Sequence, residues 1–553
     1  MQRDSWKPWA AAVLSAGLLE LPFPLAGPLP PWRSVFAWFG LVPLLAVILS
    51  PASAGKPHPL RRAFVTAYLC GVLWYMGNCY WIYNTMLHYG SLARWVCVLL
   101  LIGFSMVLGA YFGLFGWGVM AVRQGTGSTR LALAAAPFFW AAVELAGARI
   151  TCVPWDQLGY SQVDNAVVNQ LAPWTGVYGI SFVLVAVNAL IAGGLLLERR
   201  QGRRAWGGAG VVLALAGWAG ILVQPPKPAT TATAVLVQPN LNVGSSNNWI
   251  GATWDRHMAQ FERLAGEDCK SYIAGIPQTG APTREMVCPP QPVHPDLVAW
   301  PESPAPFFQS DPRLQPALAS IATSRDAAMV VGAVGTDYSE KKNEWRYYNS
   351  ALILNSMGEF VGRYDKIHLV PFGEYIPFRH LLWFARKLTG RVGSFTRGKK
   401  HKVFVLNGHR YGVFICYEAV FANEVRKFAR NGAQVFVNIS DDGWYGNTSA
   451  PWQHLNMARM RAIENRRWLL RDTNNGVTAA IDPDGRVEQS IPRHCVDALP
   501  ARFGFNSKLT FYTVHGDVFA WLCAILAIGA VLWCLPAGWR ERRRRAGKPP
   551  LTR

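Results

Sequence analysis

The sequence predicts a two-part protein: a polytopic α-helical membrane domain of about eight transmembrane helices, and an extracytoplasmic α/β domain. Three observations support this prediction. Apolar stretches of roughly 20 residues, the length that crosses a bilayer, follow one another up to about residue 224. A polar interval with short β-rich runs comes next, and one further apolar stretch follows it. Lys and Arg residues concentrate in alternate loops, which indicates how the chain is oriented in the membrane.

The composition agrees with a membrane protein of more than one domain. The 553 residues exceed what a single hydrophobic core usually organises. Hydrophobic residues make up 51% of the chain, which contains 24 Trp, and the mean hydropathy is +0.13. The ten Cys form no C-x-x-C pair, which argues against a zinc site or a thioredoxin-like motif. Because no P-loop, Rossmann glycine pattern or H-E-x-x-H motif occurs, we expect no cofactor and no metal.

The apolar segments define the expected domain boundaries. The first segment is the weakest, because Glu20, Pro22 and Pro24 interrupt it, and a cleaved signal peptide is the alternative interpretation. Seven segments precede the polar interval and the eighth follows it: residues 8–26, 33–51, 64–85, 95–121, 131–150, 174–197, 205–223 and 517–537. We therefore expect three parts: a membrane domain at 1–224, a catalytic domain at 225–512, and an eighth helix with a basic tail at 513–553.

The net charge of +21 is explained largely by topology signals. Arg3 and Lys7 suggest a cytoplasmic N-terminus, and seven crossings then place residues 225–512 outside the cytoplasm. The loops on the cytoplasmic side would carry Lys56, Arg61, Arg62, Arg123, Arg130, Arg199, Arg200, Arg203, Arg204 and the tail at 540–553. Opposite loops carry isolated residues such as Arg33, Arg94 and Arg149. The arginine run at 542–545 fits an anchor on anionic lipid better than a nucleic-acid site, so we expect no nucleic-acid partner.

The polar interval has the pattern of an α/β or α+β domain. Helical spacing appears at residues 312–325 and 452–471. Short apolar runs, typical of buried strands covered by helices, occur at 234–237, 297–300, 328–333, 351–354, 411–415 and 434–438. Residues 268–295 are rich in Pro, Gly and polar side chains and are interpreted as an insertion loop. Its Cys269 and Cys288 either pair in an oxidising compartment or remain two thiols.

Cys416 is a candidate nucleophile because of its position in the chain. It ends an apolar strand and precedes a helix-like run from Ala419. At such a turn, free backbone N–H groups can stabilise a thiolate and an oxyanion. An inert core cysteine is the alternative interpretation.

Two further ionisable residues also follow predicted strands. Lys366 lies in a stretch that ends in turn signals, where a buried ammonium can lower a thiol pKa and stabilise negative charge. Glu302 stands between Pro301 and a second proline shortly after a strand, a suitable place for a general base. Alone, these two residues are equally compatible with a solvated Lys and a turn-stabilising Glu. His368 is another possible base, or an ordinary hydrogen-bonded His.

Together, in chain order, Glu302, Lys366 and Cys416 resemble the Glu-Lys-Cys catalytic set of the nitrilase superfamily. Six blocks, which span most of the outer domain, resemble the apolipoprotein N-acyltransferase branch of that superfamily: residues 237–240, 300–302, 365–377, 415–418, 438–446 and 451–476. The order of seven segments, domain and one segment is similar to this family as well.

The resemblance implies an αββα sandwich and a specific reaction. Family members take a fatty acyl chain from a phospholipid, typically phosphatidylethanolamine, as a Cys thioester and pass it to the N-terminal amino group of S-diacylglyceryl-cysteine of an apolipoprotein. If the matching residues have the family's roles, Glu302 would remove the proton of Cys416, and Lys366 and the backbone N–H of Tyr417 would stabilise the oxyanion. A covalent thiolate divides one difficult transfer into two easier steps.

The resemblance also suggests supporting residues. Glu374 and Glu418 match acids that would orient Lys366 or its neighbours, and structural salt bridging is the alternative. Trp249 lies close to a Trp at the entrance of the family's site, although the preceding sequence is longer than the usual pattern and Trp254 is an alternative. Trp444 matches a substrate-side aromatic, or belongs to the core.

The implied setting is the bacterial cytoplasmic (inner) membrane, crossed several times, with the catalytic domain on the periplasmic face. The implied partners are the phospholipid donor, the diacylated apolipoprotein acceptor and membrane lipid, and we expect a monomer. The apolar run at 380–388, with basic residues, suits either an arm that dips into the interface or a covered helix. Two N-x-S/T triplets, at Asn438 and Asn447, lie inside the matching blocks and are interpreted as structural.

Two other functions are compatible with parts of the sequence. A membrane-tethered amidase would use the same three residues to hydrolyse small C–N substrates, but a tether needs only one crossing. A transporter or scaffold would leave the coincident blocks unexplained, and inside the apolar segments few ionisable residues occur beyond Glu20 and Glu144.

Overall fold

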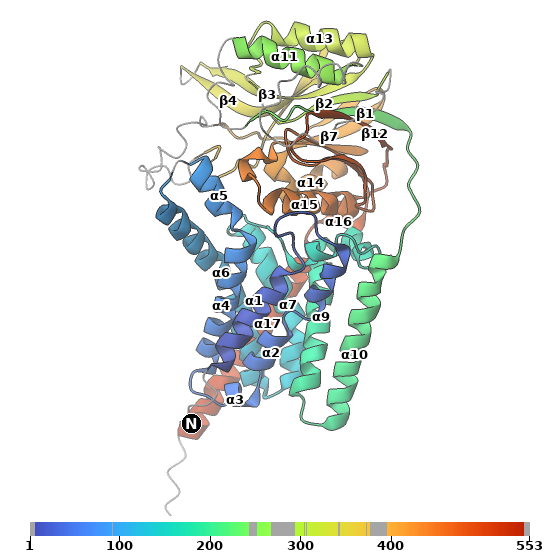
Figure 1. The fold of residues 1–553 in the computed structure, drawn as a ribbon. Coiled ribbons are helices and arrows are strands. Elements are labelled where there is room, and N and C mark those ends of the chain that lie inside the picture. Colours follow the sequence, from blue (N-terminus) through green and yellow to red (C-terminus); the bar gives the residue numbers. More distant parts are fainter. Residues whose placement is uncertain are drawn as a thin grey trace, which may run out of the picture. The chain divides into compact units, whose positions relative to one another are not determined.

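The computed structural model describes residues 6–546 apart from 91, 243–251, 267–293, 303–304, 306, 341–342, 372 and 376–394. The chain forms two compact units, each described here by itself (Figure 1). The first contains Met1–Tyr83, Trp95–Gln224 and His515–Arg553, and the second contains Asn84–Arg94 and Pro225–Val514. Trp249, Cys269, Cys288 and the run at 380–388 lie outside the described residues, as does nearly all of the expected insertion.

The first unit is helical, and it is a membrane domain. Its longer helices are α1 (Lys7–Glu20), α4 (Pro59–Asn78), α6 (Arg94–Thr126), α7 (Thr129–Arg149), α9 (Val177–Leu196), α10 (Arg200–Trp218) and α17 (Val518–Ala546). Shorter ones are α2 (Val42–Ile48), α3 (Pro51–Ala54), α5 (Trp81–His88) and α8 (Ala172–Thr175). Within the described residues, five helical stretches are long and apolar enough to cross a membrane: Pro31–Ile48, Arg94–Thr126, Thr129–Arg149, Val177–Leu196 and Arg200–Leu222.

Two of the eight predicted spans, the first and the third, differ from the observed helices. The first corresponds to α1, whose 14 residues reach about 21 Å and fall short of the bilayer core. The third divides, because α4 ends at Asn78 and α5 starts at Trp81, and the chain from Asn84 onward groups with the second unit. The eighth agrees with the prediction, because α17 (Val518–Ala546) contains nearly all of residues 517–537. Hydropathy alone does not predict where a helix ends, because apolar residues continue past the last helical turn.

Helices α4 and α6 approach closely because glycines line their contact. On α6, Gly109 and Gly113 are spaced as in the G-x-x-x-G pattern of membrane helices. A Cβ at Gly109 would lie 2.7 Å from the Val72 side chain, and one at Gly113 would lie 2.7 Å from the Phe64 ring. A larger residue at either position would therefore push the two helices apart.

The second unit contains two six-stranded sheets, and each has parallel strands at its centre. The first sheet has the order β12-β1-β2-β3-β4-β5 and the second β11-β10-β9-β8-β7-β6. The first consists of β1 (Ala232–Gln238), β2 (Leu297–Trp300), β3 (Ala328–Ser339), β4 (Glu344–Leu354), β5 (Phe360–Asp365) and β12 (Asp497–Phe503). The second consists of β6 (Val403–Leu406), β7 (His409–Ile415), β8 (Val435–Ser440), β9 (Trp468–Thr473), β10 (Thr478–Ile481) and β11 (Val487–Ile491).

Helices cover the outer face of each sheet, so the unit is the expected αββα sandwich. Figure 1 shows α11 (Ala252–Ala265) and α13 (Leu314–Arg325) over the first sheet, and α14 (Ala422–Arg430) and α15 (Ala450–Asn465) against the second. Alternation along β1 explains the layers: Val235 and Val237 pack in one buried cluster with α11 and α13, whereas Leu236 packs in the other cluster with the second sheet.

The predicted helix at 452–471 is partly wrong. Helix α15 ends at Asn465, and Arg466 then adopts a left-handed conformation with φ of 52°. The rest of the predicted segment is strand β9, in which Trp468 pairs with Val435 of β8. A short apolar run after a helix is ambiguous in sequence, and the pairing with β8 decides its conformation.

Candidate active site

The three predicted catalytic residues lie at strand ends and are buried together. Glu302 follows β2 by two residues, Lys366 directly follows β5, and Cys416 directly follows β7. Their exposed fractions are 7%, 1% and 5%. Both carboxylate and ammonium act electrostatically on the thiol, so all three side chains share one site.

Lys366 is held between two carboxylates. Its Nζ donates to Glu302 Oε1 at 2.8 Å and to Glu374 Oε1 at 2.9 Å. Asn349 Nδ2, from β4, donates to the same two oxygens at 2.6 Å each. The backbone N–H of Asp441 donates to the other Glu302 oxygen, Oε2, at 3.0 Å. These contacts determine where the Glu302 carboxylate points.

The electrostatic environment keeps Lys366 charged and the Cys416 thiol neutral. Burial lowers the pKa of Lys366, but Glu302 and Glu374 outweigh it and hold this pKa well above its ordinary value. Burial raises the pKa of the Cys416 thiol, and the Glu302 carboxylate raises it further, while the Lys366 ammonium lowers it. The balance lies well above the ordinary thiol value, so the resting site contains a protonated thiol beside a fixed carboxylate. Such a thiol needs a base to become a nucleophile.

The Cys416 backbone is strained and is held by a buried polar chain. Its φ of 50° lies in the left-handed region that side chains other than Gly rarely adopt. His454, on α15, contacts the Cys416 carbonyl oxygen through Nε2 at 3.0 Å. Its Nδ1 lies 3.1 Å from Arg471 Nη2, and Arg471 Nη2 donates to Asp442 Oδ2 at 2.8 Å.

The protonation of this chain follows from burial. His454, Asp442 and Arg471 are fully buried. Burial and the Arg471 charge lower the pKa of His454 below its ordinary value, although Asp442 opposes this. Nδ1 lies 3.0 Å from Asp442 Oδ1 as well as 3.1 Å from Arg471 Nη2, and Arg471 Nη2 also donates to that Asp442 oxygen. A neutral ring has one N–H; the Cys416 carbonyl can only accept, so we assign the N–H to Nε2, and Nδ1 then accepts from Arg471. His454 is therefore a donor that holds the Cys416 carbonyl.

Glu418 connects the two sheets below the site. Its carboxylate accepts from Tyr364 OH at 2.9 Å, from the N–H of Ile367 at 2.6 Å and from the N–H of His368 at 3.1 Å, all at the end of β5. It also accepts from the N–H of Ile415, at the end of β7, at 2.8 Å. The Lys366 and Cys416 loops are thus joined through one buried side chain.

The remaining predicted residues take different positions. Tyr417 is half-buried, and its ring meets Phe421 with the centroids 5.1 Å apart. Trp444 is half-buried against Tyr89, whose hydroxyl donates to the Gly443 carbonyl at 2.7 Å. Trp254, the alternative to Trp249, lies on α11 and packs into the buried cluster between this helix and the first sheet.

His368 stacks on Phe421 at 4.0 Å, and burial lowers its pKa. Its backbone N–H, not its ring, donates to Glu418. In the described residues its ring Nδ1 has no hydrogen-bond partner.

Sequence reasoning missed Asn349 and the residues that hold Cys416. Asn349 lies in β4, just before the apolar run at 351–354 from which this strand was predicted. A polar side chain beside a buried run needs a hydrogen-bond partner, which is a signal for a functional site. His454, Asp442 and Arg471 lie in the blocks that carry the resemblance, but their roles depend on contacts between α15, β9 and the loop after β8.

Asp441 makes stability depend on pH. Burial raises its pKa to about 8, and Glu302 contributes in the same direction. The folded state therefore retains a proton that the unfolded chain releases near pH 4, so unfolding free energy should fall as pH rises from about 4 to 8, by up to about 1.4 kcal/mol per pH unit. Asp441→Asn cannot ionise and should gain stability relative to the wild type over that interval.

Chemical unfolding of the full chain in detergent at pH 4, 6 and 8 measures this difference. The exposed Asp326→Asn variant is the control and should follow the wild-type profile. Parallel profiles for wild type and Asp441→Asn would contradict the prediction.

Comparisons with known proteins cover both units. Residues 287–493 match the family model of carbon-nitrogen hydrolases, and residues 15–190 match that of the apolipoprotein N-acyltransferase N-terminal domain. The chain is 32% identical over 522 residues to an apolipoprotein N-acyltransferase of Geobacter metallireducens, covering 93% of this chain and 92% of that one. It is 30% identical to an apolipoprotein N-acyltransferase of Bradyrhizobium diazoefficiens, covering 95% and 94%.

Among solved structures, similar proteins include Saccharomyces cerevisiae Nit3, described as a member of branch 10 of the nitrilase superfamily. It has 18% identity and a TM-score of 0.34, and the match covers 50% of this chain and 93% of Nit3. A carbon-nitrogen hydrolase from Helicobacter pylori has 15% identity and a TM-score of 0.34, with 49% and 88% covered.

Proposed function

Since the chain belongs to the apolipoprotein N-acyltransferase family, we propose that it moves an acyl chain from a phospholipid to a lipoprotein through a thioester on Cys416. The acceptor is the N-terminal amino group of S-diacylglyceryl-cysteine, and phosphatidylethanolamine is the proposed donor. The observation that carries the mechanism is the Lys366–Glu302 contact of 2.8 Å beside a buried, neutral thiol.

In the first half of the reaction, Glu302 removes the Cys416 proton as sulfur attacks the ester carbonyl of the donor lipid. The carbonyl oxygen becomes an oxyanion, which the Lys366 ammonium and the N–H of Tyr417 stabilise. The C–O bond then breaks, and the leaving alkoxide takes the proton from Glu302. The products are the Cys416 thioester and a lysophospholipid.

In the second half, the amino group of the acceptor attacks the thioester carbonyl. Glu302 accepts a proton from the amine, and the same two donors stabilise the oxyanion. The C–S bond breaks, the thiolate leaves, and the proton from Glu302 returns to Cys416. The acceptor now carries an amide, and the enzyme has its initial protonation.

The proposed setting is the bacterial inner membrane, with residues 225–512 on the periplasmic face between the membrane domain at 1–224 and the last helix at 513–553. The alternating distribution of Lys and Arg supports this orientation. The enzyme would act as a monomer without a cofactor.

The function is tested by incubating full-length enzyme in detergent with phosphatidylethanolamine and a synthetic S-diacylglyceryl-cysteine peptide. Mass spectrometry should detect a peptide heavier by one acyl group, and omission of the peptide should leave a hydroxylamine-sensitive acyl adduct on the protein. Release of ammonia from small amides, with no acylated peptide, would instead identify a membrane-tethered amidase.

His454 is expected to act as a positioning residue for Cys416. His454→Leu removes the donor to the Cys416 carbonyl and should lower kcat by about 10²-fold with little change in KM, because the nucleophile is displaced. His454→Gln retains an N–H donor at a similar reach and should recover much of the loss.

The matched control is His401→Leu. His401 does not contact Cys416 but pairs with Glu424, with its Nε2 2.6 Å from Glu424 Oε2. The kcat of this variant should equal that of the wild type. Equal defects in His454→Leu and His454→Gln, with a lower unfolding midpoint in both, would point to packing alone.

A further inference from the structure

The membrane domain contains a small cavity that the reaction does not use. It is lined by residues of α1, α4, α6 and α7 and of the segment that follows α7, all in the first unit. The carboxyl ends of three of these helices are near it in the chain, at Glu20, Asn78 and Arg149. Helix carboxyl ends carry partial negative charge, which favours a cation in this space.

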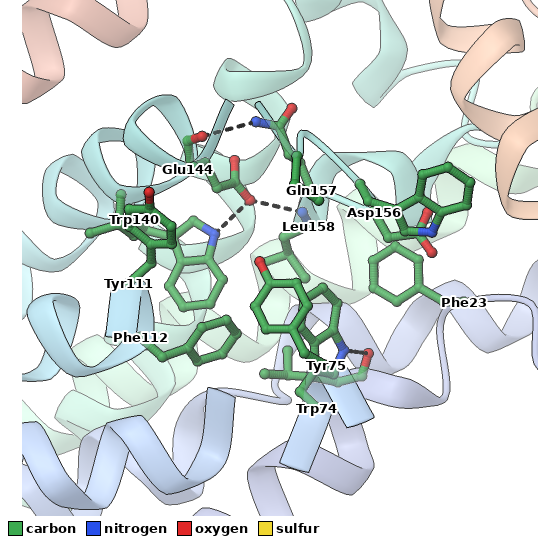
Figure 2. A pocket seen from close by; sticks show the side chains of 15 residues that line it. Phe23, Trp74, Tyr75, Tyr111, Phe112, Trp140, Glu144, Asp156, Gln157 and Leu158 are labelled. Carbon is green, nitrogen blue, oxygen red and sulfur yellow. Dashed lines mark hydrogen bonds between the residues drawn. The ribbon is translucent and has the colours of Figure 1, made fainter. Parts of the chain in front are cut away.

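Seven of the fifteen residues that line the cavity are aromatic. Figure 2 shows the rings of Phe23, Trp74, Tyr75, Phe112 and Trp140 together with the carboxylates of Glu144 and Asp156. The Phe112 and Trp140 ring centroids are 5.0 Å apart, and those of Trp74 and Phe112 are 5.6 Å apart. Faces of such rings attract organic cations.

Glu144 is held in place by uncharged donors, among them the Ser181 side chain. Trp140 Nε1 and the N–H of Leu158 each donate to Glu144 Oε1 at 2.8 Å. These contacts orient the carboxylate, which Figure 2 shows among the lining side chains. They do not neutralise it, because all of these donors are uncharged.

Asp156 is 1% exposed and also lines the cavity. Asn78 acts on its carboxylate, but neither carboxylate oxygen has a well-formed hydrogen bond within the described part of the chain. The Tyr75 hydroxyl is in electrostatic range of both Asp156 and Glu144. The Asp156 carboxylate is therefore buried beside the same cavity as Glu144, with few hydrogen-bond partners.

Negative charge exceeds positive charge around the cavity. Asp156 acts electrostatically on Glu20, at the end of α1, and both carboxylate oxygens of Glu20 are buried without hydrogen-bond partners in the described residues. Arg33 is the cation that acts on Glu20. In the described residues, no cationic side chain acts on Glu144 or Asp156. A buried acid without a counter-charge is costly, so these acids gain from a bound cation.

We propose that this cavity binds an organic ammonium group, with Glu144 and Asp156 as its anionic partners and the rings of Tyr75, Phe112 and Trp140 against its carbon atoms. An inorganic metal ion fits less well, because in the described residues no three His, Cys, Asp or Glu side chains are grouped to hold one. The ammonium group belongs either to the headgroup of a bilayer lipid or to a small free amine. The lining residues belong to the first unit and Cys416 to the second, and the proposal does not depend on acyl transfer.

Photo-crosslinking of the full-length protein in detergent tests the proposal. The probe is an ether-linked lipid with an ethanolamine headgroup and a diazirine in the alkyl chain beside the glycerol; its ether bonds offer no acyl group to Cys416. Peptides that contain residues 140–158 should be labelled about tenfold more than with the glycerol-headgroup analogue. Competition by millimolar ethanolamine would identify a small amine as the source, and its absence would identify the lipid headgroup.

The Glu144→Gln, Asp156→Asn double variant should lose this labelling about tenfold. The Glu198→Gln variant, with the same chemical change at an exposed residue, should keep it. Asp156→Asn alone preserves the contacts of Glu144. It replaces the double variant in the labelling experiment if the double variant unfolds at a lower temperature than the wild type. Equal labelling by both headgroups, or labelling that these variants leave unchanged, would overturn the proposal.

Discussion

Replacing Cys416 with Ala is expected to lower acyl transfer by about 10⁴-fold or more, because no other group can form the intermediate. Glu302 and Lys366 remain, but neither carboxylate nor ammonium can replace the sulfur at the strand end. The hydroxylamine-sensitive adduct with phosphatidylethanolamine should disappear entirely. Substrate binding should persist, since Ala removes one atom beyond Cβ and leaves the neighbouring side chains in place.

Cys495→Ala is the matched control for this variant. Cys495 is a partly buried thiol of the same unit, and its sulfur lies 3.7 Å from the Arg493 carbonyl oxygen. Intact-protein mass spectrometry should find the acyl adduct on Cys495→Ala and not on Cys416→Ala. An adduct on folded Cys416→Ala would place the nucleophile elsewhere.

Replacing Lys366 with Met should impair both activity and stability. Loss of the ammonium removes a donor to the oxyanion, and transfer should fall by about 10³-fold. It also leaves Glu302 and Glu374 buried without their cation, at a cost of about 3–5 kcal/mol in the free energy of unfolding. Chemical unfolding and the peptide acylation assay measure the two effects separately.

A second substitution separates these effects. Adding Glu374→Gln to Lys366→Met removes one of the two unpaired charges, so stability should partly return while activity stays low. Lys427→Met provides the contrast, because Lys427 pairs with Glu424 on a more exposed surface and its loss should cost less than about 1 kcal/mol. If the Lys366 and Lys427 variants lost equal free energy of unfolding, the charge pairing of Lys366 with Glu302 and Glu374 would not be what stabilises that site.

Local patterns were sufficient to find the strand ends that carry the site. Glu302 and Cys416 each follow a run of apolar residues, and such runs are recognisable because a buried strand needs apolar side chains wherever it lies. Lys366 follows the more polar strand β5, and only the turn signals after it and the family resemblance pointed to it. Helix and strand were confused at Trp468, where the same short apolar run satisfies either pattern. The first and third predicted spans were wrong in length or extent, because apolar composition continues past a helix end.

The sequence by itself determined the two-part architecture and the α/β or α+β class of the second unit, because periodicity is a property of neighbouring residues. The αββα arrangement and the set of three residues were implied by the resemblance of its motifs to a known family. Only the tertiary structure decided that Asn349 contacts Glu302 and Glu374, that His454 holds the Cys416 carbonyl, and that Glu144 and Asp156 face one cavity. Several of these contacts join residues tens of positions apart. Their geometry depends on how strands and helices pack, which no local pattern records.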